Sequence, residues 1–183
     1  MNIVETGFKG LIIIKPAVFK DNRGYFLESF NLSAIRNAGI EFNPVQDNES
    51  KSTYGVVRGL HYQLMPYAQS KLIRVVEGKI FDVALDLREK SETFGKWFGT
   101  VLDSEAKDQL LVPAGFAHGF SVLSETAVIQ YKCDNYYNRE HERGIALNDP
   151  FLSIDWKLGA LTPVLSDKDL KHPLFRDAEM NFR

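Results

Sequence analysis

The chain has 183 residues, 25% of them charged and 44% hydrophobic, which suits one soluble globular domain over residues 1–183. Its formal net charge of -2 gives no bulk electrostatic reason to expect nucleic-acid binding, and its single cysteine, Cys133, excludes an internal disulfide or a cysteine-based zinc centre. The N-terminus lacks a leader pattern and no apolar run approaches the roughly 20 residues that span a bilayer, so we expect a cytoplasmic protein without membrane association.

Most of the chain shows the period-two hydrophobic alternation of β-strands. In residues 81–88, Phe81 and Val83 alternate with Asp82 and Ala84, which predicts a strand buried on one face only. The other expected strands cover residues 11–15, 25–30, 56–63, 71–77, 97–102, 109–112 and 126–133.

Two segments break this pattern. Asn31 or Ser33 can cap a short helix over residues 34–38, which Gly39 ends. Residues 166–169 offer a second, weaker helix start near the C-terminus. Many short strands at regular spacing, with few helices between them, predict a single all-β domain of the jelly-roll type.

Two histidine-bearing segments carry the chemistry of the sequence. Residues 58–63 read RGLHYQ and include Arg58 and His61, and residues 113–120 read PAGFAHGF and include His118. A strand-rich half-domain separates them, so we expect one pocket built from both segments. That pocket could hold a metal, perform acid–base chemistry, or belong to the core.

The spacing of the histidines argues against a tightly bound metal. A catalytic metal usually has about three protein ligands, and two ligands on one strand face must lie at positions i and i+2. The residue two places after His61 is Gln63, a poor ligand for a transition metal. The remaining histidines, His141 and His172, lie in polar, loop-like sequence.

An acid–base role for His61 competes with a structural one. An imidazole with a pKa near 6.5 is suited to general-base catalysis, but a histidine bonded within the core is equally common. The polar side chains expected on nearby strands favour an anion-binding cavity, because burying them for structure alone would be costly. They are Gln46, Asn48, Arg58, Lys71, Arg74 and Tyr131.

A geometric condition applies to residues 58–63. Arg58 and His61 are three residues apart, so a regular strand would place them on opposite faces. We expect a β-bulge at Gly59 that turns both side chains toward one cavity.

An ordered series of motifs over nearly the whole chain strongly resembles the dTDP-4-dehydrorhamnose 3,5-epimerase family. The motifs are DNRGYF (21–26), QDN (46–48), RGLHYQ (58–63), KL (71–72), DVALDLR (82–88), TFGKW (93–97), PAGFAHGF (113–120), NDP (148–150) and SDKD (166–169). The resemblance implies a metal-independent, cofactor-independent, cupin-type jelly-roll barrel. It also implies a homodimer that exchanges N-terminal strands. The implied reaction inverts C3 and C5 of dTDP-4-dehydro-6-deoxy-D-glucose.

The resemblance also implies roles for individual residues. His61 is the base, Asp169 orients it, Lys71 stabilises an enolate, and Tyr131 delivers a proton to the opposite face. Asp167 is an alternative partner for His61, although the family pattern favours Asp169. An aromatic core residue remains the alternative for Tyr131, which shares a strand face with Ile129.

For the nucleotide, the resemblance places a further set of residues around the diphosphate and base. Tyr137 stacks on the thymine and His118 lines the sugar pocket, either touching substrate or supporting His61. The remaining contacts are Arg23, Glu28, Gln46, Asn48 and Arg58, with Glu142 and Lys168 as further contacts for which a surface role is equally consistent. Ala146 departs from the bulkier side chain expected there, which leaves the packing of that loop open.

Three alternatives stay open at this point. One is epimerisation at a single carbon of another dTDP-deoxysugar. A second is a non-catalytic jelly roll that binds sugar nucleotides, which would not need His61, Lys71 and Tyr131 together. A third is a metal-dependent cupin oxygenase.

Overall fold

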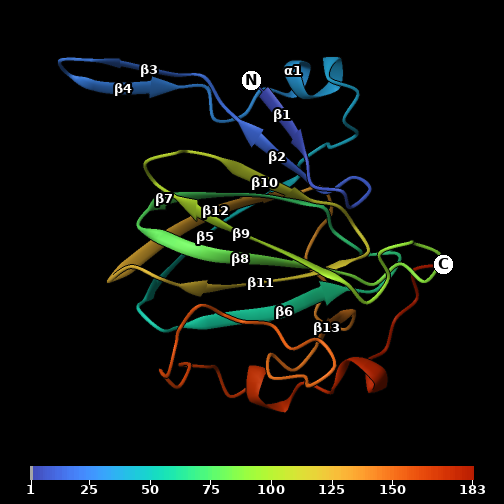
Figure 1. Ribbon diagram of the computed structural model, residues 1–183. Helices are drawn as coiled ribbons and strands as arrows, with labels where there is room; N and C mark the ends of the chain where they lie inside the picture. The colour runs from blue at the N-terminus through green and yellow to red at the C-terminus, as the bar shows by residue number, and fades with distance from the viewer. Residues whose placement is uncertain (1) are drawn as a thin grey trace.

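Two β-sheets pack face to face and form the body of the molecule (Figure 1). The computed structural model describes residues 2–183. Within them the two sheets share no strand, so the jelly roll is an open sandwich whose inner faces enclose the core. The all-β jelly-roll architecture is therefore confirmed. No helix among these residues is long and apolar enough to cross a membrane.

The first sheet has six strands in the order β1-β2-β10-β7-β12-β5. Its strands are β1 Asn2–Glu5, β2 Ile12–Lys15, β5 Gln46–Thr53, β7 Lys71–Glu77, β10 Gln109–Val112 and β12 Thr126–Cys133. The second sheet has five strands in the order β13-β6-β11-β8-β9. Its strands are β6 Val57–Gln63, β8 Lys79–Asp86, β9 Trp97–Asp103, β11 Phe116–Val122 and β13 Glu142–Gly144.

The remaining elements lie outside these sheets. The strands β3 Val18–Asp21 and β4 Gly24–Leu27 pair only with each other, and this hairpin extends away from the body (Figure 1). The helix α1, Leu32–Asn37, is capped by the Asn31 side chain and followed by Gly39 in the left-handed region, as expected. Two short 3₁₀ helices, Asp169–Lys171 and Phe175–Asp177, follow in the C-terminal segment.

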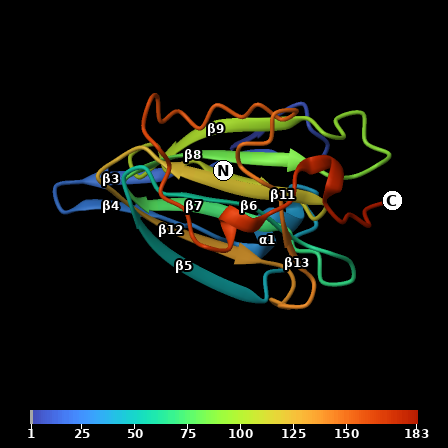
Figure 2. The ribbon, with the colours of Figure 1, turned by 90° about the horizontal axis from the view of Figure 1, so that it is seen from below.

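The strands β8 and β11 of the five-stranded sheet are buried on both faces. Its inner face contributes Ala84 and Phe120 to the core between the sheets. Its outer face carries Val83 and Leu85, which pack against the C-terminal segment where it crosses the sheet (Figure 2). The expectation that residues 81–88 form a half-exposed strand is therefore wrong, because Asp82 faces the interior and has no exposed surface.

Several strands lacked the hydrophobic alternation that would have predicted them. The clearest case is β5, whose sequence is QDNESKST. Gln46, Asn48, Ser50 and Ser52 share the less exposed face of this strand. That face is polar, so alternation between apolar and polar residues cannot develop. The strands β1, β3, β11 and β13 were likewise not predicted.

Candidate active site

His61 and Asp169 form a hydrogen-bonded dyad at one end of the sandwich. The His61 Nε2 atom lies 2.5 Å from Asp169 Oδ1. The Asp169 side chain is 4% exposed, and Ser166 Oγ donates to its second oxygen at 2.8 Å. Burial alone would raise the pKa of Asp169, but the hydrogen bonds from His61 and Ser166 outweigh it and the pKa is lowered. An ionised Asp169 therefore accepts the Nε2 proton and leaves Nδ1 of His61 as the basic nitrogen.

The C-terminal segment brings Asp169 to this position. The Ser166 hydroxyl accepts a hydrogen bond from the Asp169 backbone N–H at 3.1 Å and starts the 3₁₀ turn over Asp169–Lys171. Asp167 is exposed, and the carboxylate bonded to His61 is that of Asp169. The geometry therefore makes Asp169, rather than Asp167, the partner of His61.

A bulge at Gly59 places Arg58 and His61 on the same face, as expected. His118 pairs with His61 and Phe120 pairs with Arg58, so three residue steps on β6 match two on β11. Gly59 has φ of +125°, and a Cβ there would come within 2.5 Å of the Gly119 Cα atom. Only glycine fits this crossing between the two strands.

His118 belongs to a second imidazole–carboxylate pair, with Asp82. The His118 Nε2 atom lies 2.9 and 3.0 Å from the two carboxylate oxygens, and Asp82 is fully buried. His118 sits directly across from His61 in the strand register, but its side-chain hydrogen bonds go to Asp82. Sequence reasoning missed Asp82 because its strand was expected to have one solvent-exposed face.

The opposite sheet contributes Lys71 and Tyr131. The Lys71 Nζ atom lies 6.0 Å from the centroid of the Tyr131 ring. Burial lowers the pKa of Lys71 and raises the pKa of Tyr131. Cys133 pairs with Lys71 in the register, and burial raises its pKa to about 11. Cys133 therefore remains a neutral thiol at neutral pH, unsuited to nucleophilic attack.

Amide and guanidinium groups line the edge of the site at β5. The Gln46 side-chain amide donates from Nε2 to Asn48 Oδ1 at 3.0 Å. Its Oε1 atom accepts the Tyr137 backbone N–H at 2.9 Å. Arg58 reaches across from the other sheet and donates to Ser52 Oγ at 3.0 Å. Five donors on a planar guanidinium leave Arg58 with capacity for an anion.

Glu142 links Tyr137 and Lys168. The Tyr137 hydroxyl donates to Glu142 Oε2 at 2.7 Å, and Lys168 Nζ lies 2.5 Å from Oε1. Burial would raise the pKa of Glu142, but these two partners lower it overall. Glu142 pairs with Gln63 in the register, two residues along the strand from His61. The three predicted residues thus form one connected group at the rim of the site.

Arg23 and Glu28 are not brought to the site of their own chain. Arg23 sits on the turn of the β3–β4 hairpin, its side chain 86% exposed and paired with Asp21 at 2.6 Å. Glu28 follows the hairpin and is exposed. The hairpin that carries Arg23 extends away from both sheets (Figure 1), and Glu28 lines a pocket with Ile14, Leu72 and Gln109 rather than with His61.

His172 lies outside any helix or strand, as expected, but its ring packs against the dyad. Its ring meets the His61 ring edge-to-face at 5.3 Å, and its side chain is only 9% exposed. The segment after Asp169 turns back so that Pro173 accepts the Ala146 backbone N–H at 2.8 Å, which shows how the loop at Ala146 packs. No local sequence pattern signalled this contact, because it arises from long-range packing.

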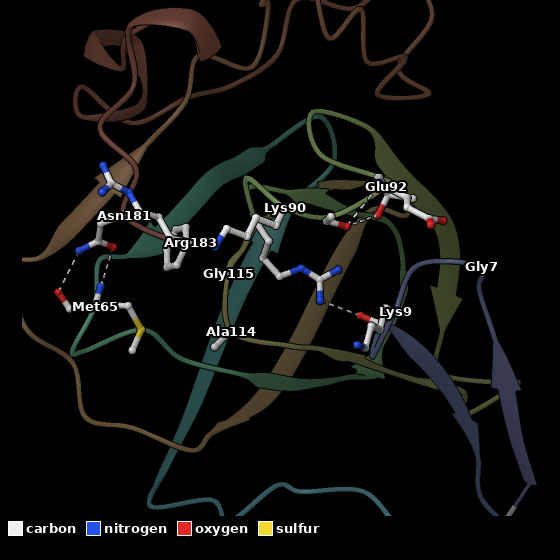
Figure 3. A pocket seen from close by; sticks show the side chains of 13 residues that line it. Gly7, Lys9, Met65, Lys90, Glu92, Ala114, Gly115, Asn181 and Arg183 are labelled. Atoms are coloured by element: carbon white, nitrogen blue, oxygen red, sulfur yellow. Dashed lines mark hydrogen bonds between the residues drawn. The ribbon is translucent and has the colours of Figure 1, made fainter.

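A separate cavity of about 940 Å³ carries none of the predicted site residues. It is lined by the N-terminal segment around Lys9, the loop around Lys90, Gly115 and the C-terminal residues around Arg183 (Figure 3). The guanidinium of Arg88 in this cavity is partly exposed and is already bonded to Asp86 and to the Lys9 carbonyl. It lacks a paired base and acid, so we assign the chemistry to the dyad.

The arrangement around the dyad suits proton transfer. A base held by a carboxylate lies on one sheet, and an ammonium and a neutral phenol lie on the other. Such groups can remove a proton next to a carbonyl, stabilise the resulting enolate and return a proton.

Comparisons with known proteins agree with this chemistry. A family profile described as dTDP-4-dehydrorhamnose 3,5-epimerase matches residues 5–177. The dTDP-4-dehydrorhamnose 3,5-epimerase of Shigella flexneri is 51% identical over 180 residues, covering 98% of each chain. The crystal structure of dTDP-4-dehydrorhamnose 3,5-epimerase from Elizabethkingia anophelis superposes with a TM-score of 0.91, 53% identity and 97% coverage of both chains. A dTDP-6-deoxy-D-glucose-3,5-epimerase from Legionella pneumophila, in complex with dTDP-4-keto-L-rhamnose, gives a TM-score of 0.91, 47% identity and coverage of 96% and 93%.

Proposed function

The chain belongs to the dTDP-4-dehydrorhamnose 3,5-epimerase family, and we propose that it converts dTDP-4-dehydro-6-deoxy-D-glucose to dTDP-4-dehydro-L-rhamnose. It is an isomerase that inverts C3 and C5 of the sugar. The observation that carries this proposal is the buried His61–Asp169 dyad on one sheet with Lys71 and Tyr131 on the other. A binding protein without catalysis would not need this set.

The reaction requires removal of protons next to the C4 carbonyl. His61 is the base, accepting each proton at Nδ1 while Nε2 donates to Asp169. The ionised Asp169 fixes the imidazole tautomer and stabilises the imidazolium that forms, as a carboxylate does in other histidine dyads. Its burial and its bond from Ser166 hold the carboxylate in one orientation.

Loss of the proton leaves an enolate whose negative charge develops on the C4 oxygen. Lys71 is the cation that stabilises this oxygen, since a charge in a water-poor site acts more strongly than in bulk water. Tyr131 then donates a proton to the face opposite His61. Its raised pKa keeps the phenol protonated at neutral pH, as a donor must be.

The proposal also assigns residues to the binding of the nucleotide. Arg58 binds the diphosphate, and Gln46 and Asn48 bind nearby polar groups of the dTDP. Tyr137, whose ring is half exposed at the rim, stacks on the thymine, while Glu142 and Lys168 hold the tyrosine in place. His118, fixed by Asp82, lines the sugar pocket.

The protein acts as a homodimer in which the N-terminal strands are exchanged. The support is the β3–β4 hairpin, which exposes Phe19, Tyr25 and Phe26 at 64%, 54% and 68% and pairs with neither sheet of its own chain. Exposed aromatic groups of this kind mark an interface. A hairpin seated on a second copy would bring Arg23 and Glu28 to that copy's nucleotide site.

Replacing Phe19 and Phe26 by aspartate should therefore convert the dimer to a monomer and lower the catalytic rate. Burying two carboxylates in an apolar interface costs several kcal/mol, enough to dissociate it. Light scattering after gel filtration measures the mass, and the exposed Phe151 gives a matched control, Phe151→Asp. An active monomer, or a double variant that stays dimeric, would contradict the exchange.

Solvent exchange tests the reaction itself. After incubation with dTDP-4-dehydro-6-deoxy-D-glucose in deuterated water, mass spectrometry and NMR should locate deuterium at both C3 and C5. Deuterium at one carbon only would indicate the single-carbon alternative. No incorporation at either carbon would refute the epimerase, and unchanged nucleotide binding in that case would indicate a binding protein.

A further inference from the structure

His172 places a third metal-binding side chain beside the catalytic dyad. One donor atom each from His61, Asp169 and His172 lies within 4.8 Å of the other two. The His172 Nδ1 atom lies 3.8 Å from the same Asp169 oxygen that His61 contacts. The three side chains come from β6 and from the C-terminal turn, so the cluster exists only in the folded chain.

The His172 nitrogen is buried without a hydrogen-bond partner among residues 2–183. The side chain is 9% exposed, so its Nδ1 atom is held away from bulk water and directed at Asp169. An unpaired polar atom in such a position costs free energy unless a ligand engages it.

Gly144 makes room for this ring. A Cβ at Gly144 would lie 2.2 Å from Cε1 and 2.4 Å from Nδ1 of His172. Gly144 is also the register partner of His61 on the neighbouring strand. The bare glycine backbone therefore lets the second imidazole approach the first.

We propose that His61, Asp169 and His172 bind a zinc ion, and that the bound ion inhibits the enzyme. Two imidazole nitrogens and one carboxylate oxygen are a donor set that zinc prefers, whereas magnesium and calcium favour oxygen ligands. Three protein ligands leave a fourth position for water. Zinc bonds of about 2.0–2.1 Å in a tetrahedron separate ligand atoms by about 3.3 Å. The dyad contact of 2.5 Å must widen to admit the ion, while the 3.8 Å contact must close slightly.

Inhibition follows from the tautomer of His61. Zinc takes the lone pair of Nε2, so the proton that Nε2 donated to Asp169 moves to Nδ1 of the same ring. The imidazole then has no free lone pair for a sugar proton, and Asp169 is also occupied. The inference about inhibition rests on the proposed function, but the inference about zinc binding does not.

A calorimetric titration of the full-length protein with zinc chloride, in the absence of substrate, tests the binding. Wild type should bind one ion per chain at this site, and His172→Asn should raise the dissociation constant at least about tenfold. His141→Asn is the matched control. His141 is a half-buried histidine that lies outside the cluster and bonds to Asn138. It should leave zinc affinity unchanged. Equal affinity in wild type and His172→Asn would overturn the site.

Activity measurements test the inhibition separately. Zinc should inhibit wild type reversibly, with recovery on adding EDTA. Measured against its own zinc-free rate, His172→Asn should resist zinc by the same factor as its loss of affinity. Zinc binding through His172 without inhibition would overturn the proposed inhibition but leave the proposed zinc site standing. If His172→Asn folds poorly, His61→Asn provides the same calorimetric comparison, and unchanged zinc affinity there would refute the ligand set.

Discussion

Replacing His61 by asparagine should lower kcat by about 10²–10⁴-fold and leave binding of dTDP nearly unchanged. In the proposed mechanism the imidazole supplies the base, whereas the proposed nucleotide contacts lie on β5, Arg58 and the rim group around Glu142. Asparagine preserves the approximate volume and polarity of the site but has no basic nitrogen. Steady-state kinetics with the 4-keto sugar and calorimetry with dTDP measure the two quantities.

Two aspartates two residues apart provide the control for this dyad. Asp169→Asn should lower kcat by a similar factor, because an amide cannot hold the His61 tautomer or stabilise its charged form. Asp167→Asn should change kcat little, since Asp167 is exposed and His61 is bonded to Asp169 instead. Equal losses in both aspartate variants would contradict the assignment, as would a His61→Asn variant that retains most of its activity.

The second large effect is expected for Lys71. Lys71→Met keeps a long side chain in the same space but removes the charge that stabilises the enolate. Loss of one electrostatic contact to a developing oxyanion typically costs about 10²–10³ in kcat. Lys132→Met is the matched control, because Lys132 lies on the neighbouring strand and pairs with Asp47 instead. A Lys71→Met variant with near-normal kcat would remove Lys71 from the mechanism.

The pH profile gives an independent measure of Lys71. Burial lowers the pKa of Lys71, so the ammonium loses its proton at a lower pH than a free lysine does. Stabilisation of the enolate is therefore present below this lowered pKa and lost as the pH rises through it. The wild-type rate should show this alkaline decline, and the residual rate of Lys71→Met should lack it.

The sequence predicted well where a local rule applied. Hydrophobic alternation identified the strand Thr126–Cys133, and the cap at Asn31 with Gly39 identified the helix Leu32–Asn37. The parity of Arg58 and His61 predicted the bulge at Gly59, because a flat strand cannot place both side chains on one face. These features depend on a few neighbouring residues and on backbone geometry.

The features that the sequence did not predict depend on packing between segments that are distant along the chain. Asp82 was expected to face solvent, because the sequence of its strand does not reveal that the C-terminal segment covers the other face. His172 reaches His61 only because the chain turns back after Asp169. Arg23 matched the family motif but lies on a hairpin that extends away from the two main sheets of its own chain. No spacing rule within one sequence encodes these three placements.

The stereochemical course of Tyr131→Phe in deuterated water tests most directly the claim that His61 and Tyr131 act on opposite faces of the sugar. In the variant, His61 can still remove a proton, exchange it with solvent and return it to the same face. Recovered substrate should therefore carry deuterium with its configuration retained, while inverted product forms about 10²–10⁴-fold more slowly than in wild type. Inversion at the wild-type rate, or substrate recovered without deuterium, would contradict this account.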